Sequence, residues 1–221
     1  MVNLKSKYKI LKISCDGGAA TGKSTGAKMI AKKYNLAFLS SGLLYRYSSY
    51  LILKHKPKNK ITFLKSKFHT LNYKKLSKIS LHSQKISKHT SIIAKIPGIR
   101  NILKKYQIKF VKKNKGCVIE GRDASTKIIP KSDIKFYFIC NLNIAAKRRY
   151  EELKKTTKNI DFDEVKSALY ARDRADRQRS ISPLQKHPLA IVIDSGILDK
   201  QKMVTKMSKY VERILKSKYE N

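Results

Sequence analysis

The sequence contains no tryptophan and only three cysteines in 221 residues. Cys15, Cys117 and Cys140 are odd in number and lie in runs that favour strands. A disulfide framework uses an even set of cysteines, and a zinc site uses closely spaced ligands. The sequence therefore argues against a disulfide-stapled scaffold. It predicts small, buried thiols in a reducing compartment.

Long hydrophobic runs are also missing, since no apolar stretch approaches the ~18 residues of a membrane span. The basic stretch from Met1 to Lys9 has no apolar core of a secretory signal peptide behind it. We therefore expect a cytoplasmic protein without membrane association. With 41% hydrophobic residues, the chain is suited to one α/β domain with its own core.

Acidic residues are scarce: 15 Asp and Glu stand against 51 Lys and Arg, a formal net charge of +36. Such a charge invites a nucleic-acid interpretation. The lysines are scattered over nearly the whole chain, however, whereas a nucleic-acid face concentrates them with aromatic residues. We therefore expect no specific nucleic-acid partner, only weak and salt-sensitive RNA binding.

Arginine is scarce as well, at 10 residues against 41 lysines. In a chain that uses lysine by default, an arginine indicates a position that needs a planar, bidentate donor. Nine of the ten lie near a predicted strand end or in a polar helix: Arg46, Arg100, Arg122, Arg148, Arg149, Arg172, Arg174, Arg177 and Arg179. This distribution is typical of a site that binds more than one phosphate group.

A glycine-rich stretch follows a strand-like run at Lys12–Asp16. It reads G-x-x-x-x-G-K-S over Gly17, Gly18, Ala19, Ala20, Thr21, Gly22, Lys23 and Ser24. Glycines allow the backbone N–H groups to wrap a polyphosphate, and the helical character of Thr25–Tyr34 would point a helix N-terminus at it. Lys23 is then expected near the β- and γ-phosphates and the Ser24 hydroxyl on Mg²⁺. A glycine-rich turn that matches by chance is the alternative.

Five strand-like runs alternate with helical segments. The strands are expected at 12–16, 36–40, 116–120, 134–140 and 189–194, and helices at 91–113 (broken near Pro97), 144–155, 161–179 and 200–216. A further helix is expected after Ser41, which would cap it. This alternation predicts a mainly parallel five-stranded sheet with helices on both faces.

Two segments interrupt this alternation. Residues 54–89 are rich in Lys, Ser and His and weakly periodic, so we expect a small mobile insertion, with a short strand at Ile61–Leu64. Its histidines (His55, His69, His82 and His89) lack metal-ligand spacing. A break at Thr156–Asn159 predicts a helix pair that projects as a lid.

Polar residues cluster at predicted strand ends. The apolar run 116–120 ends in Gly121-Arg122-Asp123, where open α/β folds bind ligands, although a surface ion pair would also explain it. Ser41 and Arg46 are expected at the same edge. Arg172, Asp176 and Arg179 share one helical face; a solvated face is the usual meaning, but here arginine replaces the lysine used elsewhere.

Together these motifs resemble the bacterial cytidylate kinases, a branch of the nucleoside monophosphate kinase family of P-loop proteins. Five motifs occur in order: G-x-x-x-x-G-K at Gly17–Lys23, S-G-x-x-Y-R at Ser41–Arg46, S-x5-P-x2-R at Ser91–Arg100, G-R-D at Gly121–Asp123, and R-x3-D-x2-R at Arg172–Arg179, followed by Ser182-Pro183-Leu184. The resemblance implies a single P-loop kinase domain over residues 1–221. A monophosphate-binding insertion would span approximately 47–113 and a lid approximately 148–164. The implied reaction is ATP-dependent phosphorylation of CMP and dCMP by a monomer.

The resemblance also implies residue roles. Gly17 to Thr25 would bind ATP, with Mg²⁺ at Ser24 or Thr25. Lys23, Arg148, Arg149 and Arg172 would neutralise charge on the transferring group. The CMP site would contain Ser41, Arg46, Ser91, Arg100, Arg122, Asp123, Asp176 and Arg179. Within it, Ser91, Arg100 and Asp123 would read cytosine, whose exocyclic amine needs an acceptor, and Asp176 would bind the ribose.

Two departures from the family pattern stand out. Ser40 occupies a position where the family usually has Asp, and the stretch between Tyr45 and Ser91 is short. Two alternatives also remain at this point. One is a P-loop kinase with another acceptor (UMP, AMP or a small alcohol such as shikimate), and the other is a basic RNA-binding P-loop protein.

Overall fold

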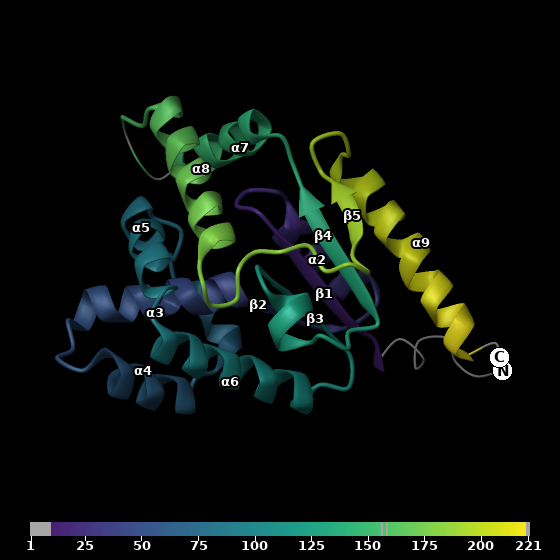
Figure 1. The fold of residues 1–221 in the computed structure, drawn as a ribbon, viewed down its shortest axis with the longest axis horizontal. Helices are drawn as coiled ribbons and strands as arrows, with labels where there is room; N and C mark the ends of the chain where they lie inside the picture. The colour runs from purple at the N-terminus through teal and green to yellow at the C-terminus, as the bar shows by residue number, and fades with distance from the viewer. Residues whose placement is uncertain (1–9, 156, 158, 220–221) are drawn as a thin grey trace.

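A five-stranded parallel sheet forms the centre of the molecule (Figure 1). The computed structural model describes residues 10–155, 157 and 159–219. The strands are β1 (Lys12–Gly17), β2 (Ala37–Ser40), β3 (Cys117–Gly121), β4 (Ile134–Ile139) and β5 (Ile191–Asp194), in the order β2-β3-β1-β4-β5. Every neighbouring pair is parallel, so the predicted sheet is confirmed.

The strand register brings polar residues to one edge. In β3, Cys117, Val118 and Ile119 are fully buried, as expected of a strand covered on both faces. The register then pairs Ser40 with Glu120 and Asp16 with Gly121. The carboxyl ends of β1, β2 and β3 therefore meet at the edge where ligands bind in open α/β sheets.

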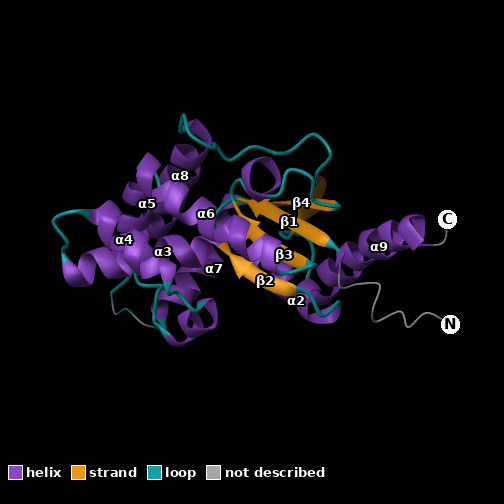
Figure 2. Cartoon of the chain, turned by 90° about the horizontal axis from the view of Figure 1, so that it is seen from below, coloured by secondary structure: helices purple, strands orange, loops and turns teal. Residues whose placement is uncertain are grey.

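Helices cover both faces of the sheet (Figure 2). On one face α2 (Lys23–Lys33) and α9 (Lys200–Tyr219) pack over β1 and β4, in a core that includes Val118. On the other, α3 (Ser41–His55) and α6 (Pro97–Lys113) pack over β2 and β3, in a core that includes Ile119. Successive side chains of a strand point to opposite faces of the sheet, so Val118 packs in one core and Ile119 in the other.

The segment between α3 and α6 is helical, which corrects one prediction. It contains α4 (Lys60–His69), the 3₁₀ helix η2 (Tyr73–Lys78) and α5 (Gln84–Ile93). The short strand predicted at Ile61–Leu64 is wrong, because this run lies in α4. The Asn59 side chain caps α4 by accepting from two backbone N–H groups, and Leu64 and Phe68, four residues apart, are both buried.

Two helix boundaries are set by local chemistry. The predicted break near Pro97 is confirmed, since α5 ends at Ile93 and α6 begins at Pro97, which has no N–H to lose at a helix start. The predicted cap at Ser41 is wrong. The side chain of Ser40 accepts from Leu43 N and caps α3, which makes Ser41 the first helical residue.

Helices α7 (Leu142–Lys154) and α8 (Phe162–Gln178) pack together through Leu153, Val165 and Leu169. The break predicted between them involves residues 156 and 158, which lie outside the described residues, as does the stretch Met1–Lys9. None of the described helices is long and apolar enough to cross a membrane.

The three cysteines are free. Cys15 and Cys117 are buried as predicted, whereas Cys140 follows β4 and is half-buried. No cluster of three His, Cys, Asp or Glu that could hold a metal ion occurs in the described part of the chain, which includes the four histidines of the insertion.

Candidate active site

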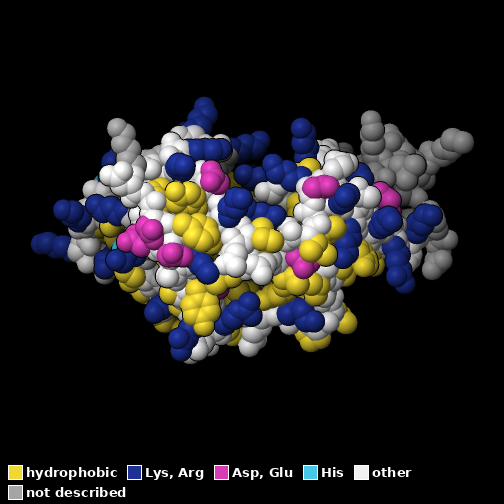
Figure 3. Space-filling model, turned by 90° about the horizontal axis from the view of Figure 1, so that it is seen from above, with side chains coloured by type: hydrophobic (Ala, Val, Ile, Leu, Met, Phe, Trp, Pro, Cys, Tyr) yellow, Lys and Arg dark blue, Asp and Glu magenta, His cyan; other side chains and the backbone are white. Residues whose placement is uncertain are grey.

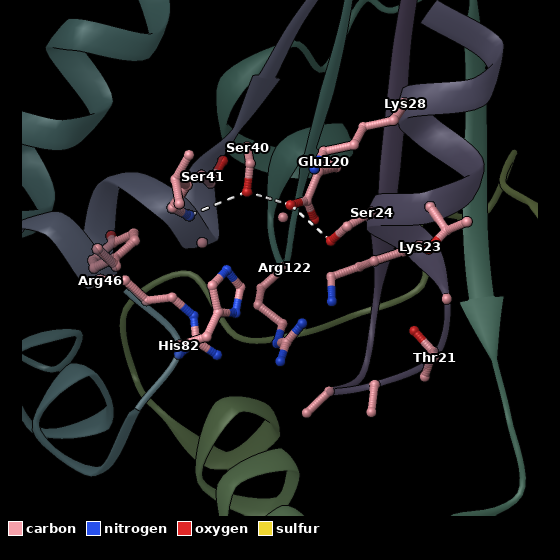
Figure 4. Close-up of a pocket in the computed structure, with 18 of the residues that line it drawn as sticks. Thr21, Lys23, Ser24, Lys28, Ser40, Ser41, Arg46, His82, Glu120 and Arg122 are labelled. Atoms are coloured by element: carbon pink, nitrogen blue, oxygen red, sulfur yellow. Dashed lines mark hydrogen bonds between the residues drawn. The ribbon is translucent and has the colours of Figure 1, made fainter. Parts of the chain in front are cut away.

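A cleft of about 990 Å³ opens at the carboxyl edge of the sheet. It is lined by the phosphate loop (residues 17–25, named here for its sequence), the insertion, and helices α7 and α8. All the predicted site residues line it except Gly17 and Gly18: Ala19, Ala20, Thr21, Gly22, Lys23, Ser24, Thr25, Ser41, Arg46, Ser91, Arg100, Arg122, Asp123, Arg148, Arg149, Arg172, Asp176 and Arg179. Figure 4 shows Lys23 and Arg122 pointing into this space.

The phosphate loop joins β1 to α2. Gly22 has a φ of 72°, a left-handed conformation that glycine adopts readily, and it starts α2 without a side-chain cap. The Thr21 hydroxyl donates to Gly18 O at 3.0 Å and closes the loop on itself. The first N–H groups of α2 are thus left for an anion, as at other helix N-termini that bind phosphate.

Lys23 lies inside this loop. Its Nζ donates to Gly18 O at 2.9 Å, and the side chain is nearly buried. Burial, followed by the charge of nearby Arg122, lowers the pKa of Lys23 to about 7. Without a bound anion, this amine is therefore close to half-protonated at neutral pH. A bound polyphosphate would favour its protonated form.

Glu120 is a site residue that the sequence motifs missed. Its Oε1 accepts from Ser24 Oγ at 3.0 Å and also from Ser40 Oγ, and only 2% of the residue is exposed (Figure 4). Glu120 thus supplies a carboxylate beside Ser40, where the family pattern has Asp. An acidic residue near the end of an otherwise apolar, buried strand is the sequence signal that could have identified it.

Arg122 links three parts of the site. Its Nε donates to Asp176 Oδ2 at 2.8 Å and its Nη1 to Gly17 O at 2.7 Å. The second Asp176 oxygen accepts from Arg179 at 3.0 Å. Burial alone would raise the pKa of Asp176, but the charge and hydrogen bond of Arg122 lower it overall. This carboxylate is therefore held ionised between two guanidinium groups.

Two arginines keep donors without partners. Arg172 makes no hydrogen bond to any described residue, and burial, then the charge of Arg122, lowers its pKa to about 10. Arg179 Nη2 is buried, and no acceptor is found for it in the described part of the chain. Unpaired cationic donors at a cleft are costly unless an anion binds there, so both indicate an anionic ligand.

Arg100 and Asp123 form a buried ion pair, with 2.6 Å between Nη2 and Oδ2. The other Asp123 oxygen, Oδ1, accepts no hydrogen bond in the described part of the chain. Ser91 lines the same cleft from α5. The structure thus brings together the three residues predicted to recognise a base.

Asp16 is a second buried carboxylate that the sequence motifs missed, and it contacts the backbone that follows Asp123. Its carboxylate accepts from Ala124 N and Ser125 N, both at 2.7 Å, in the π-helical turn η3 (Ala124–Ile128). Burial raises the pKa of Asp16 to about 6, against the opposing hydrogen bonds of Ser125. Asp16 therefore holds the backbone that follows Arg122 and Asp123.

The neighbours Arg148 and Arg149 contact different parts of the cleft. Arg148 donates to Ser195 O at 2.7 Å, near the phosphate loop. Arg149 donates to Glu152 at 2.6 Å and to Ser87, in the insertion, at 3.0 Å. On the same side, Arg46 donates to Ser87 at 2.7 Å. Ser41 instead donates to Gln107 and is buried.

Known proteins resemble this chain in sequence and fold. The family model for cytidylate kinase matches residues 13–213. A cytidylate kinase from Bartonella tribocorum is 37% identical, covering 92% of this chain and 95% of that protein, and one from Rickettsia akari is 32% identical, covering 96% and 98%. A shikimate kinase from Bacteroides thetaiotaomicron has the same fold at 11% identity (TM-score 0.50, covering 91% of this chain and 98% of that one).

Proposed function

The chain belongs to the cytidylate kinase family, and from that premise we propose that its cleft transfers the γ-phosphoryl group of ATP to CMP. Family membership favours CMP over the other acceptors considered, and over RNA binding without transferase activity. The observation that carries the proposal is the cleft itself: a phosphate loop on one side, the Arg100–Asp123 pair on the other, and unpaired arginine donors in between.

Residues Gly17 to Thr25 bind the ATP phosphates in this proposal. Lys23 leaves its contact with Gly18 O and meets the β- and γ-phosphates, because a full negative charge is a better partner than a carbonyl. The loop amides and the start of α2 supply further donors. These groups bind the donor and neutralise charge that develops during transfer.

Mg²⁺ fits the oxygen groups beside the phosphate loop. The Ser24 hydroxyl and the buried Glu120 carboxylate, joined by a hydrogen bond, are the hard oxygen donors that this ion prefers. Ser24 would hold the ion, Thr25 is the neighbouring hydroxyl, and Glu120 would hold the ion or its waters. When bound, Mg²⁺ would offset the negative charge of the phosphates.

The acceptor lies on the other side of the cleft. Asp123 Oδ1 accepts a hydrogen bond from the exocyclic amine of cytosine. Asp123 Oδ2 keeps Arg100 in place, and Ser91 adds a hydroxyl. We assign the binding of the ribose hydroxyls to Asp176, whose carboxylate can accept further hydrogen bonds. Because Asp176 contributes only one of several contacts with the acceptor, we propose that dCMP is a substrate as well. The remaining residues of this side surround the acceptor phosphate in the proposal: Ser41, Arg46, Arg122 and Arg179.

The reaction is an in-line displacement. An oxygen of the CMP phosphate bonds to the γ-phosphorus of ATP as the bond to the bridging oxygen breaks, which yields CDP and ADP. The chain contributes position and charge: Lys23 and Arg172, with Arg148 and Arg149 from the lid side, neutralise the equatorial oxygens. We assign monophosphate binding to approximately 47–113 and lid movement to approximately 148–164, which would exclude water.

The single chain supplies every group of this site, so we propose a monomer. Figure 3 shows Lys and Arg distributed over the whole visible face rather than gathered in one stripe. We therefore propose that RNA binds this surface weakly and that binding fades steeply as salt is raised.

The test is an ADP-release assay with ATP, Mg²⁺ and a panel of CMP, dCMP, UMP, AMP and shikimate. We expect turnover only with CMP and dCMP, and none in a Lys23→Ala control. Turnover confined to another acceptor would overturn the base-recognition residues. A folded, ATP-binding protein that releases no acceptor-dependent ADP would overturn the proposed function.

A further inference from the structure

One serine hydroxyl in the insertion contacts two of the site arginines. Ser87 Oγ accepts from Arg46 Nη1 at 2.7 Å and from Arg149 Nη2 at 3.0 Å, and it donates to Ser83 O at 2.8 Å. A hydroxyl has one donor and two acceptor positions, so all three are used here. No motif of the sequence includes Ser87.

The two arginines come from different parts of the fold. Arg46 is on α3, and Arg149 is on α7, the second half of which belongs to the proposed lid. Ser87 is on α5 and contacts both arginines. The loop before α5 adds carbonyl acceptors: Leu81 O lies 3.3 Å from Arg46 Nη1 and His82 O lies 3.0 Å from Arg149 Nη2. Figure 4 shows Arg46 and His82 across the cleft from Lys23 and Thr21.

The two guanidinium groups repel each other. Burial, then the charges of Arg172 and Arg149, lowers the pKa of Arg46 to about 9. Of the two, only Arg149 has a carboxylate partner among the described residues. This partner is Glu152 at 2.6 Å, which also lies 3.2 Å from His82 Nδ1. Ser87 and the carbonyls are neutral, so they fix both side chains without cancelling the charge of Arg46. That charge remains available to an anion in the cleft.

We propose that Ser87 is a positioning residue that holds Arg46 and Arg149 side by side, and so aligns the insertion with helix α7 around the acceptor phosphate. The inference rests on the proposed function, which places these arginines at the acceptor phosphate and the transferring group. Ser87 does not line the cleft, so it is not expected to touch either substrate. It acts because a guanidinium that is already oriented loses less rotamer freedom when the phosphate binds.

The test compares three variants in the full chain: Ser87→Ala, Ser87→Thr and Ser66→Ala. Ser66 is an exposed helical serine in α4 that does not line the cleft, so Ser66→Ala controls for loss of a helical hydroxyl in the insertion. We expect Ser87→Ala to lower kcat/KM for CMP by about tenfold or more, with KM for ATP changed less than twofold. Ser87→Thr, which keeps the hydroxyl, should recover most of the loss.

A coupling measurement decides whether Ser87 acts through its partner. If it does, Ser87→Ala lowers kcat/KM for CMP by a smaller factor in an Arg149→Ala background than in the wild type. If the double variant instead shows the product of the two single losses in kcat/KM, the inference is overturned. A Ser87→Ala variant with unchanged kcat and KM would overturn the inference about Ser87 and leave the proposed function intact. A wild-type chain without CMP-dependent ADP release would overturn the proposed function too. Thermal unfolding of each variant separates these outcomes from misfolding.

Discussion

Arg122 Nε lies 2.8 Å from Asp176 Oδ2, and this contact joins the end of β3 to helix α8. The same guanidinium reaches the carbonyl of Gly17 in the phosphate loop. The phosphate loop and helix α8, which we propose to bind the donor and the acceptor, therefore share one planar group. A change at Arg122 is transmitted to both sides, which makes it the first position to test.

Arg122→Lys is expected to lower kcat/KM for CMP by roughly 10²-fold, because a point charge cannot make the divergent contacts of the guanidinium. Steady-state kinetics with ATP and CMP measure the effect. Arg213→Lys is the matched control, since Arg213 is exposed on α9, away from the cleft. An unchanged rate in Arg122→Lys would refute the assigned role.

Asp123→Ala is expected to relax the choice of base, because it removes the acceptor for the cytosine amine and leaves Arg100 without its buried partner. The ratio of kcat/KM for CMP to that for UMP should fall about tenfold or more. Asp123→Asn retains one acceptor oxygen, so this ratio should fall less in that variant. If the preference for CMP survived in Asp123→Ala, cytosine recognition would lie elsewhere.

ATP binding is expected to take up a proton above pH 7. Burial and Arg122 hold the pKa of free Lys23 at about 7, and the bound phosphates raise it, so above pH 7 the amine must gain a proton on binding. Affinity should therefore fall as pH rises, by up to about tenfold per pH unit.

Calorimetry at pH 8 in buffers of different ionisation enthalpy measures this uptake. The observed heat should depend on the buffer in the wild type and lose that dependence in Lys23→Met. Equal heats in all buffers for the wild type would contradict the prediction.

Glu120→Gln is expected to raise the Mg²⁺ concentration needed for half-maximal activity by about tenfold, because an amide oxygen is a weaker partner for a divalent cation than a carboxylate. Activity is measured against free Mg²⁺ at saturating ATP and CMP. Glu151→Gln, an exposed change on α7, is the control. Identical Mg²⁺ dependence in the two variants would remove Glu120 from the metal site.

Local patterns in the sequence predicted most of the framework. The apolar runs that became β1 to β5 and the G-x-x-x-x-G-K-S loop depend on residues adjacent in the chain, so their structure could be predicted. Residues 60–69 could not be assigned in this way. The run Ile61–Leu64 looks like a strand by itself, and only the Asn59 cap and the core contacts of Leu64 and Phe68 make it a helix.

The sequence by itself determined the parallel sheet, the phosphate loop and the identity of the arginines and carboxylates at the strand ends, since these follow from local composition and spacing. Only the tertiary structure decided which of those groups meet. Glu120 joins Ser24 across 96 positions of the chain and Arg122 joins Asp176 across 54. Arg46 and Arg149 share Ser87 because three separate helices converge there. Such pairings depend on strand order and helix packing, which act over distances that no local pattern encodes.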